Sequence, residues 1–142
     1  MRLTRFTDYG LRTLIFLVAE GKGKRARVQD IVECFDLSKD HLVKIVQRLA
    51  ALGYVETIRG KNGGIRLLRE PAEINLAQAI VELESTLEPI DCEALSCRLS
   101  SDCRLRNILS EAKRAFVEVL RQYTVADLVV DRGALRGQLG LS

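Results

Sequence analysis

The stretch that decides the fold covers residues 38–68 and reads SKDHLVKIVQRLAALGYVETIRGKNGGIRLL. Ser38 is a good helix N-cap, and apolar side chains then recur at helical spacing as far as Leu52. Two short runs typical of β-strands follow, at 54–58 and 65–68, and the glycine-containing sequence RGKNGG separates them. The stretch therefore predicts a helix followed by a β-hairpin with a cationic tip.

The outer surface of this helix and hairpin is rich in cations and hydrogen-bond donors. A charged helix face is usually only solvated, but a helix with a cationic hairpin behind it is also what a DNA-reading head requires. The helix would enter the major groove, and the hairpin would reach backbone phosphate or the minor groove. We therefore predict DNA contacts from Ser38, Lys39, His41, Lys44 and Arg48 on the helix and from Arg59, Lys61 and Asn62 on the hairpin.

Two further helices are predicted before this stretch, over residues 7–20 and 28–35. Apolar side chains recur near helical spacing in the first of them, and Thr7 or Asp8 can accept hydrogen bonds from the free amides of its first turn. The basic sequence GKGKRAR at 21–27 separates the two helices. Three helices followed by a basic hairpin make up the plan of a winged helix-turn-helix domain.

The charge of the chain is divided unevenly about Pro71. Residues 1–70 hold 14 Lys/Arg and 8 Asp/Glu, whereas residues 71–142 hold 8 and 11, although the net charge of the whole chain is only +3. Ordinary surface charge is one interpretation of this difference. The other is that residues 1–70 form a DNA-binding domain, because a basic half is the part suited to a polyanionic partner.

The acidic half is dominated by an amphipathic helix predicted over residues 105–123. Its apolar stripe would run for about 30 Å, which is long for the core that this half can build. We expect the helix to pair with its copy in a homodimer that presents two heads to a pseudo-palindromic operator. Packing against a preceding helix around 76–83 is the alternative, and both can hold. The remainder is predicted as a linking region within 71–130 and a flexible tail at 131–142.

Three of the four cysteines lie in the predicted loop 88–104, as Cys92, Cys97 and Cys103. Cysteines grouped in a reducing cytosol are typical of metal ligands or reactive thiols. Zinc sites prefer tighter spacing and four ligands, and a thiol enzyme needs a nearby histidine, whereas the only histidine is His41. The spacing therefore favours an iron–sulfur cluster, 4Fe-4S or 2Fe-2S, with zinc, metal-free thiol chemistry and inert cysteines as alternatives.

Other features exclude whole classes of protein. The opening MRLTRFTDYG lacks the pattern of a secretory signal, and the apolar run at 14–19 is far shorter than the roughly 20 residues that cross a bilayer. We therefore expect a cytoplasmic protein with no membrane contact. No acid–base group accompanies the thiols, so an enzyme is not expected. Cys34, within the apolar sequence IVECF, is predicted to be a small buried side chain.

Several segments together resemble the Rrf2 family of bacterial winged-helix regulators. They are LTRFTDYGLRTL, HLVKIVQRLAALGYV, RGKNGGIRL, the three loop cysteines and YTVADLV. Within the family, the chain is most similar to the nitric-oxide-sensing repressors. The members that regulate iron–sulfur assembly have a histidine ligand shortly after the last cysteine, where this chain reads RLRN.

The resemblance implies a homodimeric repressor of genes for nitric-oxide detoxification. Such a repressor binds its operator with an intact cluster and releases it when nitric oxide nitrosylates the iron. The resemblance also implies a fourth ligand, Asp8 of the partner subunit, whereas the plain interpretation of Asp8 is a carboxylate that favours the first turn of its helix. A regulator that senses iron or iron–sulfur supply is the alternative function within the same family.

Overall fold

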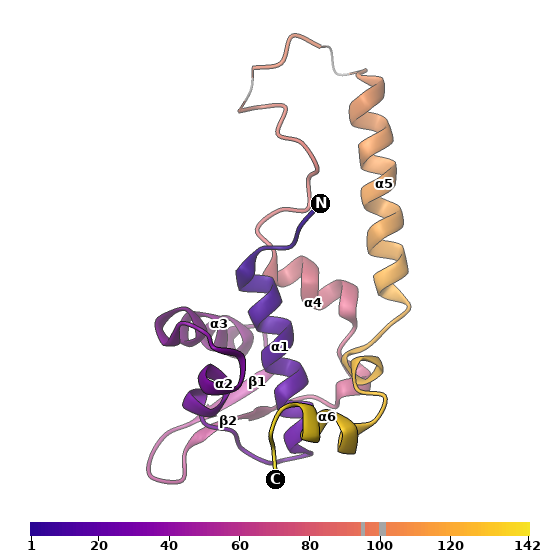
Figure 1. Cartoon of the computed structure of the whole chain (residues 1–142). Helices are drawn as coiled ribbons and strands as arrows, with labels where there is room; N and C mark the ends of the chain where they lie inside the picture. The colour runs from indigo at the N-terminus through magenta and orange to yellow at the C-terminus, as the bar shows by residue number, and fades with distance from the viewer. Residues whose placement is uncertain (95, 100–101) are drawn as a thin grey trace.

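The computed structural model of the chain describes residues 1–94, 96–99 and 102–142. It has a mainly helical head with a two-stranded hairpin, from which one long helix projects (Figure 1). The elements in order are α1 (Arg5–Glu20), α2 (Val28–Phe35), α3 (Lys39–Ala51), β1 (Val55–Ile58), β2 (Gly64–Leu67), the short 3₁₀ turn η1 (Pro71–Glu73), α4 (Leu76–Leu83), α5 (Arg104–Arg121), the 3₁₀ turn η2 (Val125–Leu128) and α6 (Arg132–Gln138). The predicted fold class, mainly α with a small β-hairpin in a winged-helix arrangement, is confirmed.

The N-terminal caps explain where the helices of the head begin. Ser38 caps α3 as predicted, because its Oγ accepts a hydrogen bond from the amide of His41 at 3.4 Å. The predicted cap of α1 is wrong by one turn. Thr4, rather than Thr7 or Asp8, accepts the amide hydrogen bond, from Thr7 at 3.4 Å, and this places the side chain of Thr7 inside the head.

The hairpin has the predicted position and a simple register. Strands β1 and β2 are antiparallel, with Val55 opposite Leu67 and Ile58 opposite Gly64. Val55 is buried beneath the sheet together with Ile65, whereas the turn that joins the strands is exposed. The hairpin is therefore anchored to the head by one apolar face, and its tip projects into solvent.

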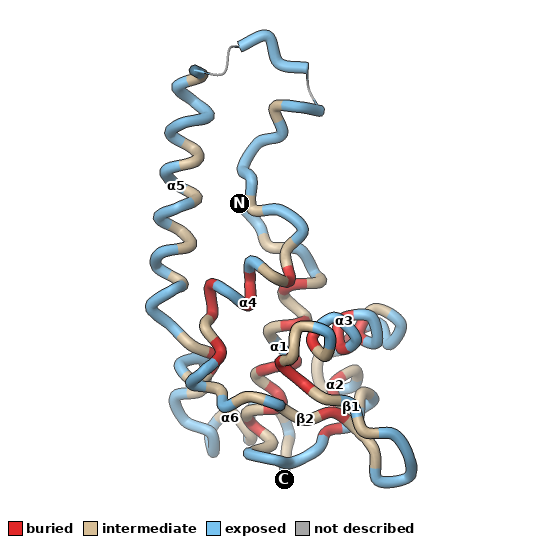
Figure 2. The backbone as a smooth tube through the Cα atoms, turned by 180° about the vertical axis from the view of Figure 1, so that it is seen from behind, coloured by how far each residue is buried: buried red, intermediate tan, exposed pale blue. Residues whose placement is uncertain are grey.

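The core of the head continues across Pro71 into the second half of the chain. Figure 2 shows its buried residues on α1, α3, the hairpin and α4. Ile74 and Val125 are completely buried in the same cluster, and the amide of Val125 donates to the carbonyl of Ile74 at 2.9 Å. Asn75 caps α4 and also donates its side-chain amide to the carbonyl of Arg121 at 2.8 Å. These contacts fix the C-terminal end of α5 to the head.

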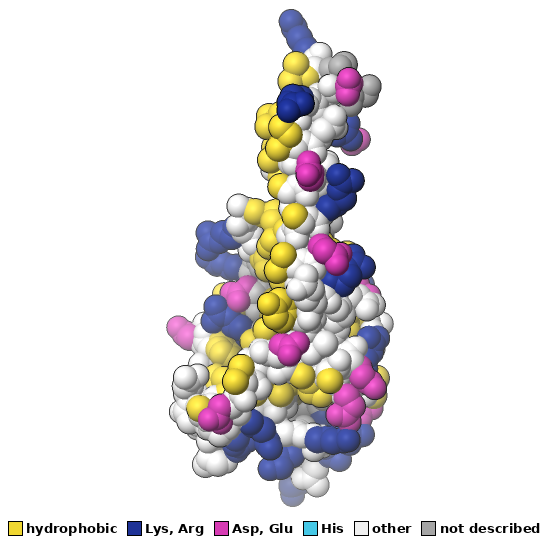
Figure 3. Space-filling model, turned by 90° about the vertical axis from the view of Figure 1, so that its right-hand side faces the viewer, with side chains coloured by type: hydrophobic (Ala, Val, Ile, Leu, Met, Phe, Trp, Pro, Cys, Tyr) yellow, Lys and Arg dark blue, Asp and Glu magenta, His cyan; other side chains and the backbone are white. Residues whose placement is uncertain are grey.

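Helix α5 confirms the predicted long amphipathic helix, and most of its residues are exposed. It has no buried residue, although it contacts α4, and Phe116 and Leu120 are half-buried. Apolar side chains gather along one side of it in Figure 3. The exposed ones that lie on α5 or directly after it, here called the α5 stripe, are Leu105, Ile108, Val119 and Tyr123. Among the described residues, no helix is both long and apolar enough to cross a membrane.

The C-terminal residues differ from their prediction as a flexible tail. They contain α6, which contacts α1. The guanidinium of Arg132 donates to the carbonyls of Ala19 at 3.0 Å and Glu20 at 2.7 Å, and Arg136 donates to that of Ala19 at 2.9 Å. These carbonyls end α1 and have no partner within the helix, so the two arginines satisfy them and complement the helix dipole. The tail prediction is therefore corrected to a docked helix.

We expect the double substitution Arg132→Gln and Arg136→Gln to lower the free energy of unfolding by about 1 to 2 kcal/mol, because charged hydrogen bonds to helix-terminal carbonyls are lost. The measurement is the midpoint of urea unfolding of the metal-free protein. Arg121→Gln is the control, since its ion pair with Glu118 is exposed on α5 and contributes little. Equal midpoints for the double variant and the control would show that α6 does not stabilise α1.

Candidate nucleic-acid interface and cysteine loop

The exposed face of α3 carries cations that are predicted to contact DNA. Lys39 and Lys44 are exposed, while Leu42, Ile45 and Leu49 on the opposite face are completely buried. The apolar face fixes the helix to the core and leaves the cationic face free for solvent or a ligand. This arrangement suits a recognition helix, whose N-terminal residues contact base edges.

His41 is held by two aromatic side chains that sequence reasoning did not identify. Its ring lies edge-on to that of Tyr9, with centroids 5.4 Å apart, and its centroid is 6.0 Å from that of Phe6. Both aromatic residues come from α1, so the imidazole is half-buried at the contact between α1 and the start of α3. Packing therefore accounts for part of the role of His41, and its predicted DNA contact remains a prediction.

Arg48 makes a contact inside the protein near the C-terminal end of α3. Its Nη2 donates to the backbone carbonyl of Glu82, in the last turn of α4, at 3.1 Å. The carboxylate of Glu82 accepts a hydrogen bond from the hydroxyl of the buried Tyr54 and another from Gln78 at 2.9 Å. The end of α4 is thus tied both to α3 and to the start of the hairpin. A role of Arg48 in DNA contact remains a prediction.

Tyr54 is the buried anchor of this connection. The guanidinium of Arg69 lies over its ring, 4.7 Å from the centroid. Burial, together with the hydrogen bond to Glu82, raises the pKa of the Tyr54 phenol well above its ordinary value, so the hydroxyl remains a donor. A lone tyrosine between a helix and a strand gave no sequence signal for this contact, because its partners lie on distant segments.

The hairpin tip presents Arg59, Lys61 and Asn62, and all three are exposed. The amide of Gly63 donates to the carbonyl of Gly60 at 3.0 Å, which closes the turn. The tip is therefore an ordered cationic projection from the same head that carries α3. The three side chains are accessible for the DNA contacts predicted for them.

The cysteine loop connects α4 to α5, and its described residues lie away from the core of the head (Figure 1). All the thiols are free. Cys97 is exposed, while Cys92 and Cys103 are half-buried. Cys92 lines a hollow between the loop and α5 together with Arg106 and Leu109. Within 1–94, 96–99 and 102–142, no three Cys, His, Asp or Glu side chains are grouped closely enough to hold a metal ion. The structure therefore does not bring the predicted ligands together in one chain.

The three loop thiols have the chemistry that an iron–sulfur cluster requires, although the described part of the chain does not arrange them around a common centre. Three free thiols on a polar segment outside the core are available to bind iron as thiolates. Cys103 is the N-cap residue of α5 and makes no side-chain capping bond within the described part of the chain, so its sulfur is not committed to the helix. A cluster would require the loop to rearrange so that the thiols converge.

Asp8, the predicted fourth ligand, lies in the first turn of α1. Its Oδ1 accepts a hydrogen bond from Nε of Arg12 at 2.8 Å, and both side chains are nearly half exposed. An exposed pair of this kind contributes little to stability. The carboxylate is accessible, and its role as a metal ligand remains a prediction.

Cys34 belongs to a different environment from the loop cysteines. It is half-buried on α2, packs against the core, and its Sγ lies 3.6 Å from the carbonyl of Leu139 near the C-terminus. Burial raises the pKa of the Cys34 thiol, which favours the neutral form over the thiolate that binds metals. The prediction of a small buried side chain is met only in part, because Cys34 packs against the core but stays half-buried.

The comparison with known proteins identifies a family and close relatives. The model of the family described as "Rrf2: Iron-dependent Transcriptional regulator" matches residues 3–131. A protein of Geobacillus kaustophilus named HTH-type transcriptional regulator NsrR is 47% identical over 142 residues, which cover 98% of this chain and 97% of the relative. A protein of the same name from Shouchella clausii is 43% identical over 142 residues, with 98% and 95% covered.

Among solved structures, the fold is similar to that of CymR (YrzC), the global cysteine regulator of Bacillus subtilis. The TM-score is 0.74 at 27% sequence identity, and the alignment covers 90% of this chain and 95% of CymR. The resemblance extends well beyond the head, because an alignment of this coverage spans most of the chain.

Proposed function

The chain belongs to the Rrf2 family of transcriptional regulators, and from that premise we propose that it is a nitric-oxide-responsive repressor. It would bind operator DNA as a dimer with an intact iron–sulfur cluster and release the operator in response to nitric oxide. One observation carries this proposal. The head presents cations on α3 and on the hairpin, and the loop that leaves the same head carries three free thiols.

The exposed cations of the head support the proposed DNA binding. Lys39 and Lys44 of α3 and Lys61 of the hairpin tip are exposed; α3 would enter the major groove, and Lys61 would meet phosphate. Base contacts by α3 would select the DNA sequence, while phosphate contacts by the hairpin would fix the position of the head along the duplex. The named relatives are transcriptional regulators, so this role agrees with the family.

The cluster would be held by Cys92, Cys97 and Cys103, with Asp8 of the partner subunit as the fourth ligand. When bound, it would supply iron that a small diatomic gas can reach, because the loop is largely exposed. A carboxylate is a weaker ligand for this iron than a thiolate, so the fourth position is the more open to exchange. A ligand from the partner would also connect the loop of one subunit to the head of the other.

The chain's own contacts offer a route from the loop to the DNA-reading surface. Glu84 directly follows α4, and its carboxylate accepts a hydrogen bond from the amide of Thr4, the cap of α1, at 3.2 Å. Glu82 accepts the hydrogen bond from Arg48 of α3. A change in the path of the loop would therefore act on the start of α1 and the end of α3 together. This would alter the separation of the two heads and their fit to the half-sites.

The test uses protein purified and reconstituted without oxygen and a DNA duplex that this protein selects from a random library. We expect tight binding of this duplex by the reconstituted protein, and release of the duplex as nitric oxide is added. Retention of the duplex after the visible spectrum has been changed by nitric oxide would contradict the proposal.

A sensor of iron or iron–sulfur supply is the second candidate, and the family description as iron-dependent favours it. The same experiment separates the two functions if a second sample is treated with an iron chelator in place of nitric oxide. Release by the chelator alone, with binding unaffected by nitric oxide, would identify the supply sensor.

We expect Asp8→Asn to alter the spectrum of the reconstituted protein and slow or speed its reaction with nitric oxide, while the unfolding midpoint of the metal-free protein barely changes. Asparagine is a much poorer iron ligand than aspartate, and the exposed pair with Arg12 contributes about 1 kcal/mol at most. Arg12→Gln is the control, since it removes the same pair and keeps the carboxylate. Wild-type Mössbauer parameters and kinetics in Asp8→Asn would return Asp8 to a purely helical role.

A further inference from the structure

The basic segment GKGKRAR, residues 21–27, connects α1 to α2 and lies outside the recognition helix, the hairpin and the cysteine loop. It contains four cations within seven residues, Lys22, Lys24, Arg25 and Arg27. A basic loop is often only a solvated connection. The contacts of this one distinguish it from such a loop, because they fix it to the hairpin.

Ala26 pairs with the hairpin as a third strand position. Its amide donates to the carbonyl of Ile65 at 2.8 Å, and the amide of Ile65 donates back to the carbonyl of Ala26 at 2.8 Å. This antiparallel pair lies at the outer edge of β2. Gly64 permits the close approach, since it has a φ of +149° and a Cβ there would lie 2.6 Å from the Ala26 carbonyl oxygen.

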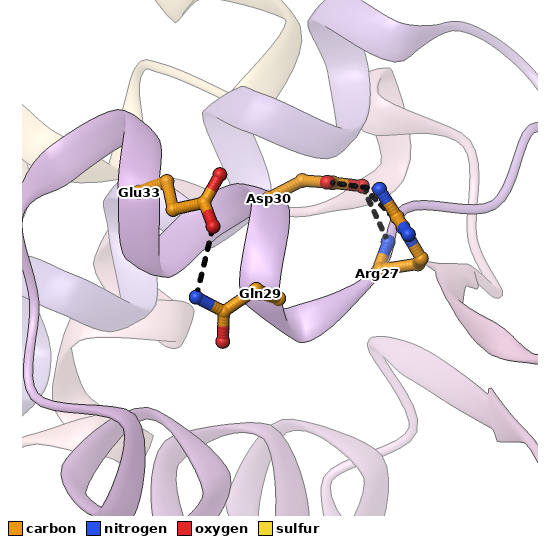
Figure 4. Close-up of polar contacts among 4 residues, drawn as sticks. All are labelled: Arg27, Gln29, Asp30 and Glu33. Carbon is orange, nitrogen blue, oxygen red and sulfur yellow. Dashed lines mark hydrogen bonds and ion pairs between the residues drawn. The ribbon is translucent and has the colours of Figure 1, made fainter.

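Two of the four cations are neutralised by carboxylates. Nζ of Lys22 lies 2.6 Å from Glu70. The guanidinium of Arg27 donates to Asp30 at 2.9 Å, and the same carboxylate accepts the amide of Arg27 at the start of α2, as Figure 4 shows. The Gln29–Glu33 hydrogen bond in the same view lies along α2 and involves neither cation. Lys22 and Arg27 are therefore each paired with a carboxylate of the same chain.

The other two cations, Lys24 and Arg25, form no ion pair with a carboxylate in the part of the chain that the structure describes. Lys24 is exposed and has no ion pair among the described residues. Nη1 of Arg25 donates to the backbone carbonyl of Asn62 in the hairpin turn, which is an uncharged acceptor. Arg25 thus connects the segment to the tip of the hairpin. Lys24 and Arg25 together add two positive charges beside those of Arg59 and Lys61.

We propose that Lys24 and Arg25 form one phosphate-binding surface with the hairpin tip, so that the α1–α2 segment contacts the DNA backbone beside the wing. The inference rests on the DNA binding proposed above and adds a second chain segment to that interface. Pairing through Ala26 holds the segment in place, so the two cations are positioned in the free protein. The ligand chemistry is the phosphodiester backbone, and base sequence would not affect it.

The experiment compares Lys24→Gln and Arg25→Gln with wild type in binding to a labelled random-sequence duplex of about 30 base pairs, followed by anisotropy over a salt series. Each variant should bind about fivefold more weakly near physiological salt, and the slope of log affinity against log salt should fall by about 1. Lys22→Gln is the matched control in the same segment and should retain the wild-type slope, because Glu70 already neutralises Lys22. Lys61→Gln is the positive control on the wing.

The outcomes separate this inference from the proposed function. Wild-type slopes for Lys24→Gln and Arg25→Gln, with a reduced slope for Lys61→Gln, would overturn the inference and leave DNA binding intact. No salt-dependent binding by the wild type would overturn both. Because Arg25→Gln also removes the contact with Asn62, Lys24→Gln tests charge alone, and an effect confined to Arg25 would assign that residue to holding the hairpin.

Discussion

Cys97→Ala is expected to give a protein that cannot be reconstituted with a brown iron–sulfur chromophore and no longer releases DNA in response to nitric oxide. Each missing thiolate leaves one iron of the cluster without a ligand, and the exposed loop offers no fourth cysteine to replace it. The same loss is expected for Cys92→Ala and Cys103→Ala. The measurement is the iron and sulfide content of the reconstituted protein together with its visible spectrum.

This loss should occur without unfolding of the head. Cys97 is exposed on a loop outside the core, so its truncation removes no buried contact, and the urea midpoint of the metal-free variant should equal that of the wild type. Cys34→Ala is the matched control and should keep the chromophore, because Cys34 packs on α2 next to Leu139. A colourless wild type that carries one equivalent of zinc after careful anaerobic reconstitution would contradict the cluster.

The head could be predicted closely from local sequence because its elements carry strong periodic signals. Helices α2 and α3 and the hairpin lie within a residue or two of the predicted ranges. Residue type and position alone predict Ser38 as the cap of α3, and its Oγ accepts the amide hydrogen bond of His41. Apolar spacing predicts the long helix over 105–123, and α5 covers Arg104–Arg121. In these segments the apolar spacing and the end signals agree, so tertiary contacts had nothing to override.

The features that could not be predicted depend on partners far away in the chain. Helix α6 is rich in glycine and arginine and has little periodicity, and it is fixed by carbonyls at the end of α1. The contacts of His41 with Tyr9 and of Arg48 with Glu82 likewise join separate helices. The thiol chemistry and the spacing of the loop cysteines indicate possible metal ligands. These two signals cannot determine whether the loop brings the cysteines together.

The second large effect is expected from the α5 stripe, in the double variant Ile108→Glu and Val119→Glu. Ile108 is 50% exposed and Val119 is 56% exposed, on a helix with no buried residue. Burial of the stripe against a second copy would contribute on the order of 10 kcal/mol before the costs of association. Two buried glutamates on each subunit would remove that contribution, so we expect a monomer at micromolar concentration by analytical ultracentrifugation.

The same variant should bind its selected operator at least about 100-fold more weakly. In a dimer, the second head meets its half-site as an intramolecular event, and this advantage is lost when the heads separate. Val130→Glu is the control, because Val130 is 97% exposed and lies outside the stripe. It should remain dimeric with wild-type affinity.

The two readouts together determine what covers the stripe. A monomer that loses affinity is the result expected if the stripe is the contact between copies. A dimer with wild-type affinity in spite of both glutamates would contradict that role and place the contact on another surface. A monomer that keeps full operator affinity would show that one head suffices for recognition. The cysteine loop could then control binding only through contacts within its own subunit, which are those of Glu82 with Arg48 and of Glu84 with Thr4.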